Sequence, residues 1–226
     1  LKNFCTMKIK FGSIVTDGRG KLGGQVYARN RSGAYVRNKV TPNNPQTIAQ
    51  SAARSRLAKF SEQWRGLSQA QRDAWNAAAP DFAKTNVFGD SVNPTGKNLF
   101  TQLNVNLADI RGPVIENPPV PVEISEPGEL TVVANSAPEL SVSFEGVEGQ
   151  SYKIFATPPL SPGVGFFKNK FRMIDTHSGP ADTPINLFDK YNAKFGSFDE
   201  GQKVAIKVVP VVDSTGQKGI GSVGSQ

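Results

Sequence analysis

The sequence is poor in the residues that build disulfides and metal sites. Among its 226 residues it has one cysteine, Cys5, and one histidine, His177. A single cysteine forms no disulfide within the chain, and the two residues together are too few for a zinc site of cysteines and histidines. His177 lies in the stretch Asp-Thr-His-Ser-Gly-Pro at 175–180, which is typical of a surface loop. We therefore expect neither a metal site nor a histidine-based catalytic triad.

Long apolar runs are also missing. The chain is 38% hydrophobic, enough to bury a core, but no stretch approaches the roughly 20 apolar residues of a membrane-spanning helix. Residues 1–6 lack the apolar segment of a secretory signal. Met7, followed by Lys-Ile-Lys, resembles a natural start, so we expect residues 1–6 to be an upstream extension or an expression remnant. No membrane partner is expected.

Acidic residues are nearly absent from the first sixty positions. That segment has twelve Lys and Arg residues against one acid, Asp17. Residues 61–112 balance at five of each sign, and residues 113–226 carry nine basic and thirteen acidic side chains. This separation predicts two modules with different partners. The basic module would bind phosphate or an acidic protein surface, and the mildly acidic one would face solvent.

The basic segment has the pattern of a small β-meander. Loose alternation predicts strands at 8–15, 25–29 and 34–40, separated by turns at Asp17-Gly18 and at Asn-Arg-Ser-Gly, 30–33. Three such strands are too few to bury a core of their own. We therefore expect a helix or another chain against this sheet, and an open edge that a neighbouring subunit could extend.

Three helices are expected next. Asn44 can cap a first helix that begins at Pro45, and Ser68 begins a capping box that starts a second helix ending near Ala79. A third follows residues 93–96. Apolar residues recur at helical spacing along the first and third helices: Ala53, Leu57, Phe60 and Trp64, then Leu99, Leu103, Leu107 and Ile110. Trp64 and Trp75 are the expected core anchors of this helical unit.

The last half of the chain has short strands. Residues 113–121 are rich in proline and predict a semi-rigid linker. Beyond it, strands are expected at 129–134, 139–144, 152–156, 171–174, 203–211 and 219–223, a density typical of an antiparallel sandwich. The predicted class is α+β. A basic α+β docking domain spans 1–112, and a β-sandwich that folds by itself spans 122–226.

The candidate interaction residues are basic. They could neutralise several phosphates without sequence preference, or they could meet an acidic protein surface, and the sequence leaves both open. Tyr27 and Tyr35 alternate with them, as stacking residues would. The set is Arg19, Lys21, Arg29, Arg31, Arg37, Lys39, Arg54, Arg56 and Lys59.

Three other patterns resemble functional motifs only in part. Residues 18–23 have the glycine spacing of dinucleotide-binding loops, but a strand rather than a helix follows them. The second helix has one base, Arg72, which is too few for a DNA recognition helix. Glu123, Glu126 and Glu129 are typical of solvated charge. We find no catalytic constellation, so we expect a protein that is not an enzyme, with no cofactor and no small-molecule substrate.

Two sets of residues resemble known families. Residues 139–144 (ELSVSF), 151–155 (SYKIF) and 205–222 look like the B, C and F–G strands of a fibronectin type III or immunoglobulin-like domain. In the first half, residues 20–24 (GKLGG), 42–47 (PNNPQT) and 64–75 (WRGLSQAQRDAW) are similar to uncharacterised phage and prophage proteins.

This resemblance implies a structural component of a bacteriophage virion, made in the host cytoplasm and present in several copies. The basic half would dock onto other virion proteins of the capsid, connector or tail, and the sandwich would project or bridge subunits. The alternative is a phage accessory protein that binds nucleic acid nonspecifically through its basic hairpins.

Overall fold

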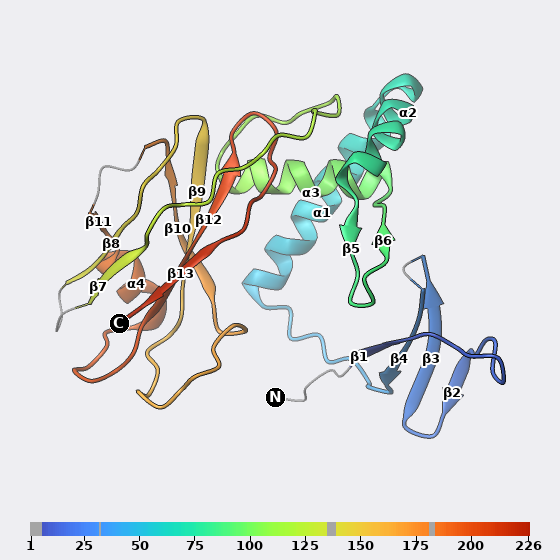
Figure 1. Cartoon of the computed structure of the whole chain (residues 1–226), viewed down its shortest axis with the longest axis horizontal. Helices are drawn as coiled ribbons and strands as arrows, with labels where there is room; N and C mark the ends of the chain where they lie inside the picture. The colour runs from blue at the N-terminus through green and yellow to red at the C-terminus, as the bar shows by residue number, and fades with distance from the viewer. Residues whose placement is uncertain (1–5, 32, 135–138, 181–183) are drawn as a thin grey trace. The chain divides into compact units, whose positions relative to one another are not determined.

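A computed structural model describes residues 6–31, 33–134, 139–180 and 184–226 (Figure 1). By its internal contacts the chain divides into two compact units. One consists of residues 1–53 with 85–92, and the other of residues 54–84 with 93–226. This division differs from the boundary expected at 113–121, because the helices and the C-terminal strands belong to the same unit. The expected α+β class is confirmed.

The first unit contains a four-stranded antiparallel sheet in the order β1-β4-β3-β2. The first strand ends far earlier than expected, and the glycine-rich segment adds a fourth strand, so the expected three-stranded meander is wrong in detail. Gly23 has a φ of 57°, which lets the chain turn tightly from β2 into β3. The strands are β1 (Thr6–Ile9), β2 (Gly20–Leu22), β3 (Gln25–Asn30) and β4 (Gly33–Asn38).

A short hairpin joins this unit. Strands β5 (Lys84–Thr85) and β6 (Ser91–Val92) flank a turn that is closed by the side chain of Asn86. Asn86 also donates to Asp90, and this hydrogen bond, together with one from Lys10, holds the pKa of Asp90 below its ordinary value. Lys10 thereby ties the hairpin to the chain just after β1, with its ammonium 3.0 Å from the Asp90 carboxylate.

Helix α1 (Ile48–Gly66) begins three residues later than expected. Gln46 has a left-handed φ of 48°, which no helix interior permits, so Pro45 is not its first residue. The hydroxyl of Thr47 accepts from the Gln50 amide at 3.3 Å and supplies the cap instead. The expected capping box at Ser68 is confirmed and starts α2 (Gln69–Ala78), which continues into a short 3₁₀ helix, η1 (Ala79–Phe82).

Helix α3 (Gly96–Asp109) provides the centre of the helical layer. Its expected stripe is confirmed at Leu99, Leu103 and Leu107, each 1% exposed. The stripe of α1 is confirmed only in part, because Phe60 is buried whereas Leu57 is 57% exposed. The core cluster consists of Phe60, Leu67, Trp75, Leu99, Phe100 and Leu103.

The segment after α3 is held in place rather than free. Asn104, buried in α3, accepts from the Ile115 amide at 2.9 Å and donates to its carbonyl at 3.2 Å. The Trp75 indole donates to the Glu116 carbonyl at 2.7 Å. Residues 115–116 are therefore part of the helical layer, although their proline-rich setting is typical of a linker.

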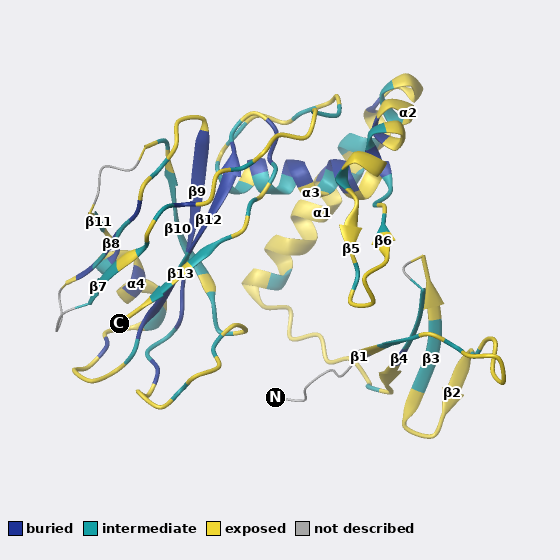
Figure 2. Ribbon diagram, in the orientation of Figure 1, coloured by how far each residue is buried: buried dark blue, intermediate teal, exposed yellow. Residues whose placement is uncertain are grey.

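Two sheets follow. One has the order β11-β8-β7 and the other β10-β9-β12-β13, and every pairing is antiparallel. Alternate residues of β8, β9 and β12 point between the sheets and form one core, which Figure 2 shows in dark blue on β9 and β12. The strands are β7 (Thr131–Ala134), β8 (Leu140–Ser143), β9 (Gln150–Ala156), β10 (Arg172–Ser178), β11 (Ile185–Asn186), β12 (Ala205–Val212) and β13 (Ser222–Ser225).

Two features of this region were not expected. Helix α4 (Phe188–Phe195) lies between β11 and β12 and buries Tyr191 in the core between the sheets. His177 belongs to β10, paired with Tyr152, so its assignment to a surface loop is wrong. The strand predicted at 171–174 continues to Ser178 because its backbone pairs with the buried strand β9.

The turn between β12 and β13 meets α3 closely. Gly216 has a φ of 69°, and a Cβ there would lie 2.4 Å from the Leu103 carbonyl oxygen. Its own carbonyl accepts from Asn106 at 2.9 Å. Only glycine permits both this conformation and this approach, so the helical layer and the sheets share a tight contact.

Replacing the two tryptophans should have unequal effects. Trp75 is fully buried, and its ring packs edge-on against Phe100 at 5.4 Å, whereas Trp64 is only partly buried. We expect Trp75→Ala to lower the free energy of unfolding by about 3–5 kcal/mol. Trp64→Ala should cost clearly less in the same urea titration. Equal losses would contradict this packing.

Candidate functional site

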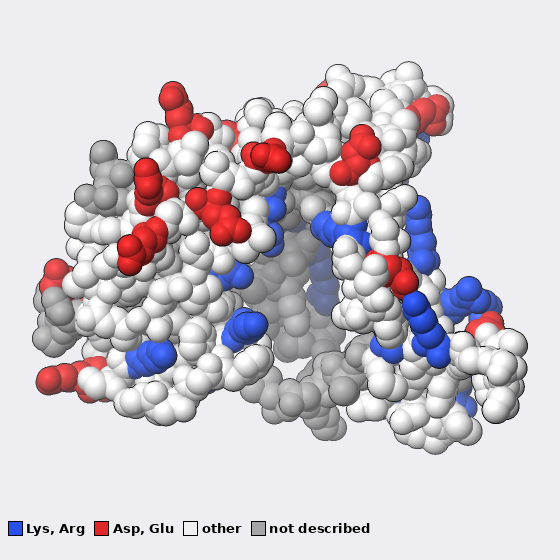
Figure 3. Space-filling model, viewed as in Figure 1, with Lys and Arg blue, Asp and Glu red and all other residues white. Residues whose placement is uncertain are grey.

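One face of the N-terminal sheet is basic. The strand register places Lys21, Val26 and Arg37 in one row across β2, β3 and β4. Directly paired residues point to the same side of an antiparallel sheet. The neighbouring row across β1, β4 and β3 has Lys8 opposite Tyr35, and Tyr35 opposite Ala28. We call Lys8, Lys21, Tyr35 and Arg37 the basic face. In the view of Figure 3, basic side chains are prominent over this unit.

The opposite face is mainly apolar. It carries Met7, Tyr27 and Val36 in one row, and Ile9, Ala34 and Arg29 in the next. Tyr27 and Tyr35 therefore lie on opposite faces, and the expectation that both alternate with the basic residues on one surface is wrong. The period of a strand is two, so residues on paired strands share a face only if the register allows it.

Burial in this sheet is slight. Among the described residues of β1 to β4, only Val36 is buried, at 8% exposure. Met7 and Leu22 are 60% and 70% exposed, and Figure 2 shows yellow and teal through most of these strands. The sheet thus exposes apolar side chains as well as charge, which is typical of a surface that a partner covers.

The remaining predicted basic residues are scattered. All are exposed, but Arg19 pairs with Asp17 at 3.5 Å and Arg31 lies in the turn between β3 and β4. Lys39 follows β4 and donates its backbone amide to Gly24. Arg54, Arg56 and Lys59 lie on α1, and their positions fall in the second compact unit. The structure therefore brings together Lys21 and Arg37 but not the whole predicted set.

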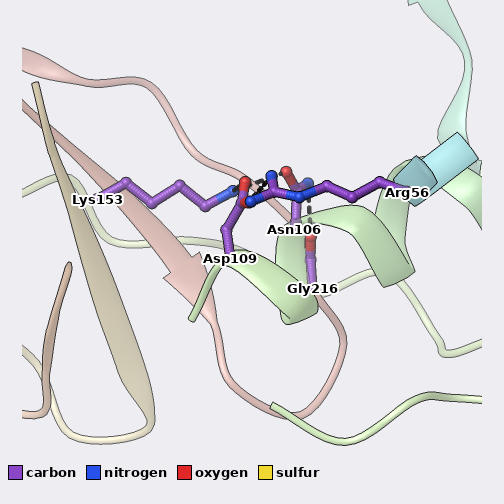
Figure 4. A network of polar contacts seen from close by, with 5 residues as sticks. All are labelled: Arg56, Asn106, Asp109, Lys153 and Gly216. Carbon is purple, nitrogen blue, oxygen red and sulfur yellow. Dashed lines mark hydrogen bonds and ion pairs between the residues drawn. The ribbon is translucent and has the colours of Figure 1, made fainter. Parts of the chain in front are cut away.

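Arg56 takes part in a different arrangement, a polar network around Asp109 (Figure 4). Asp109, at the end of α3, accepts from Arg56 of α1 at 2.5 Å and from Lys153 of β9 at 2.7 Å. Lys153 also donates to Asn106 at 3.1 Å. Three elements that are distant in sequence meet at this one carboxylate.

Lys153 is the unusual member of this network. Its side chain is 4% exposed, and the loss of hydration lowers its pKa, whereas the hydrogen bond and charge of Asp109 raise it in part. A buried ammonium is costly unless it is paired and hydrogen-bonded. Lys153 thus depends on Asp109, whereas the half-exposed Arg56 can remain solvated without it.

This pair could not be predicted from the sequence. Residues 151, 153 and 155 alternate with the core positions of β9, so Lys153 has the pattern of a solvent-facing residue. It is buried because α3 covers that face of the sheet. Asp109 was likewise one of several balanced charges in residues 61–112.

In the described ranges, no three His, Cys, Asp or Glu side chains are grouped so as to bind a metal ion. Within the same ranges, no helix has the length and apolar character to span a membrane. Comparison of the chain with protein-family models, with curated proteins and with solved structures gave no match.

The network predicts an order of mutational effects. Asp109→Asn leaves the buried Lys153 ammonium without a carboxylate, so we expect a loss of about 3 kcal/mol in the free energy of unfolding. Lys153→Met leaves Asp109 paired with Arg56 and should cost less. Arg56→Met breaks a half-exposed pair and should cost about 1 kcal/mol or less. Chemical denaturation measures all three, and a Lys153→Met loss as large as that of Asp109→Asn would refute the order.

Proposed function

We propose that the chain is a non-enzymatic structural protein of a bacteriophage virion. In this proposal the N-terminal sheet docks onto another virion protein, in several copies per particle. The body formed by residues 54–84 and 93–226 then projects from the particle or bridges subunits. The observation that carries docking is the near absence of burial in the described part of β1–β4, where Val36 alone is buried.

The chemistry of the sheet favours one class of partner. Its basic face offers Lys8, Lys21 and Arg37, while only one acid, Asp17, occurs in the first sixty residues. A partner surface that carries acidic side chains would complement the charge of this face. Strand β2 is a short outer strand of this sheet, so a partner strand could also extend it.

The strand order of the C-terminal body supports the sandwich part of the proposal. In immunoglobulin-like domains, strand B lies between A and E, strand C lies beside F, F lies beside G, and C′ extends that sheet. If β7 to β13 are read as A, B, C, C′, E, F and G, the orders β11-β8-β7 and β10-β9-β12-β13 become E-B-A and C′-C-F-G. Residues 157–170 and α4 would be insertions into this plan.

Two charge reversals on adjacent strands test docking. Arg37 lies on the basic face and Arg29 on the opposite face, and both are exposed. We expect Arg37→Glu to reduce recovery of the chain with intact particles at least about tenfold, as disruption of a contacting charge does. Arg29→Glu makes the same change of net charge and should have little effect.

Hydrogen exchange on the unmodified chain tests whether a partner covers the sheet in the particle. Hydrogen exchange at residues 7–40 should be fast in the isolated protein and slow in the particle, because a partner would then protect the exposed backbone. Equal exchange in both states would contradict the docking proposal. Equal recovery of Arg37→Glu and Arg29→Glu with particles would contradict it as well.

The second candidate is a nucleic-acid-binding accessory protein. The observation in its favour is Tyr35, which lies in the middle of the basic face, where a base could stack while Lys8, Lys21 and Arg37 contact phosphates. In that case, nonspecific DNA binding should weaken steeply with salt, and Arg37→Glu should reduce the slope of log K against log salt by about 1. Retention on DNA that does not respond to salt would exclude this candidate.

A further inference from the structure

Helix α3 ends with an arginine where glycine is usual. Ile110 caps the helix, the Gly112 amide donates to the Leu107 carbonyl at 2.8 Å, and the Arg111 amide donates to the Ala108 carbonyl at 3.4 Å. These two hydrogen bonds define a Schellman motif, whose residue after the cap adopts the left-handed conformation. Arg111 does so with a φ of 60°. A residue other than glycine in this conformation carries backbone strain.

Arg111 is exposed and lines a cavity in the second compact unit. The cavity has a volume of about 320 Å³, and its wall comes from the end of α3, from β9 and β10, and from α4. Ile110 is the one apolar residue among those that line it. The main polar residues of the wall are Arg111, Ser151, Asp175, His177 and Lys190.

The charges in this cavity are unevenly matched. Lys190 donates to Asp175, so that pair is satisfied internally. The neighbouring Lys153 is bound by Asp109. Among the described residues, the side chains of Arg111 and His177 make no hydrogen bond or ion pair. The wall of the cavity therefore includes an exposed guanidinium without a counter-charge. His177 is paired with Tyr152 and points to the same side of the sheet as that core residue, whereas Thr176 is paired with Lys153 and points to the side that α3 covers.

Hydroxyl groups complete the set of donors. Ser151 is 4% exposed and lines the cavity from β9, and Thr176 and Ser178 line it from β10. Because these three residues share one face of the paired strands, they can act together with the five N–H groups of the guanidinium, which is more donors than the two oxygens of a carboxylate can accept. A phosphate group has more acceptor oxygens, and an arginine can bind two of them at once.

We propose that this cavity binds a phosphate group, with Arg111 as its main ligand. The volume exceeds that of a phosphate alone and lies at the lower end of small-molecule sites. The phosphate could belong to a small phosphate ester or to a nucleic-acid backbone. This site would also revise the expectation that the chain binds no small molecule. None of its residues lies in the N-terminal sheet, so its failure would leave the docking proposal intact.

His177 lines the cavity and supplies a reporter, because it is the one histidine in the chain. Its imidazole proton resonances can be followed by NMR without assignment of the other residues. We expect inorganic phosphate, added at constant ionic strength, to shift these resonances along a saturation curve. Sodium acetate at the same concentrations should give no saturable shift.

Arg111→Gly is the test variant, because glycine suits the left-handed position and should preserve the helix end. We expect its phosphate affinity to fall at least about tenfold, as the loss of a charged hydrogen bond implies. Arg65→Gln removes the same charge from an exposed site at the end of α1 and should bind like the unmodified chain. Unsaturable shifts, equal shifts with acetate, or equal affinity in Arg111→Gly would each overturn the proposal.

Two further titrations identify the source of the phosphate. Adenosine monophosphate and a short single-stranded oligonucleotide are compared through the same His177 resonances. Tighter binding of the nucleotide that depends on Arg111 assigns the site to small phosphate esters. Tighter binding of the oligonucleotide that depends on Arg111 assigns it to a nucleic-acid backbone.

Discussion

The pairing of Asp109 with the buried ammonium of Lys153 is the interaction on which the main body depends. A charge that is 4% exposed cannot remain in the protein without a partner of opposite sign. Because Asp109 ends α3 and Lys153 lies in the middle of β9, the pair fixes the helix against one sheet. Arg56 of α1 pairs with the same carboxylate. Asn106 accepts a hydrogen bond from Lys153 and donates one to the Gly216 carbonyl, which connects the turn between β12 and β13 to this network.

The N-terminal sheet differs from the main body in having little buried structure. It has no comparable buried pair among its described residues, and its one buried side chain is Val36. Because so little of it is buried within the chain, we propose that a partner covers this sheet and that the sheet has a docking role. Residues 54–84 and 93–226, in contrast, have two cores of their own, one among the helices and one between the sheets.

Local patterns predicted much of this fold. The capping box at Ser68 and the stripe of Leu99, Leu103 and Leu107 depend on neighbours three or four positions away, so the sequence displays them directly. The strands β8, β9 and β12 were also predicted. The capped start of α1 was placed too early because Asn44 and Pro45 suit a helix start, and only the left-handed Gln46 rules it out.

Long-range contacts could not be predicted in this way. Lys153 follows the pattern of an exposed strand residue, and the covering helix is distant in sequence. The same limit explains His177, whose strand is set by pairing with β9, and Ile115, which is held by Asn104 although prolines surround it. The basic face also depends on register, which separates Tyr27 from Tyr35. Residues of the site proposed around Arg111 come from four elements and have no shared motif.

We infer that the helical layer and the two sheets form one cooperative body. A urea titration followed by one-dimensional NMR tests this inference, because Trp64 and Trp75 report on the helices and His177 reports on β10. We expect the folded indole and imidazole signals to disappear at the same urea concentration, as in a two-state transition. A His177 signal that stays folded after both indole signals are lost would contradict it. The strands from residue 122 onward would then fold without the helices.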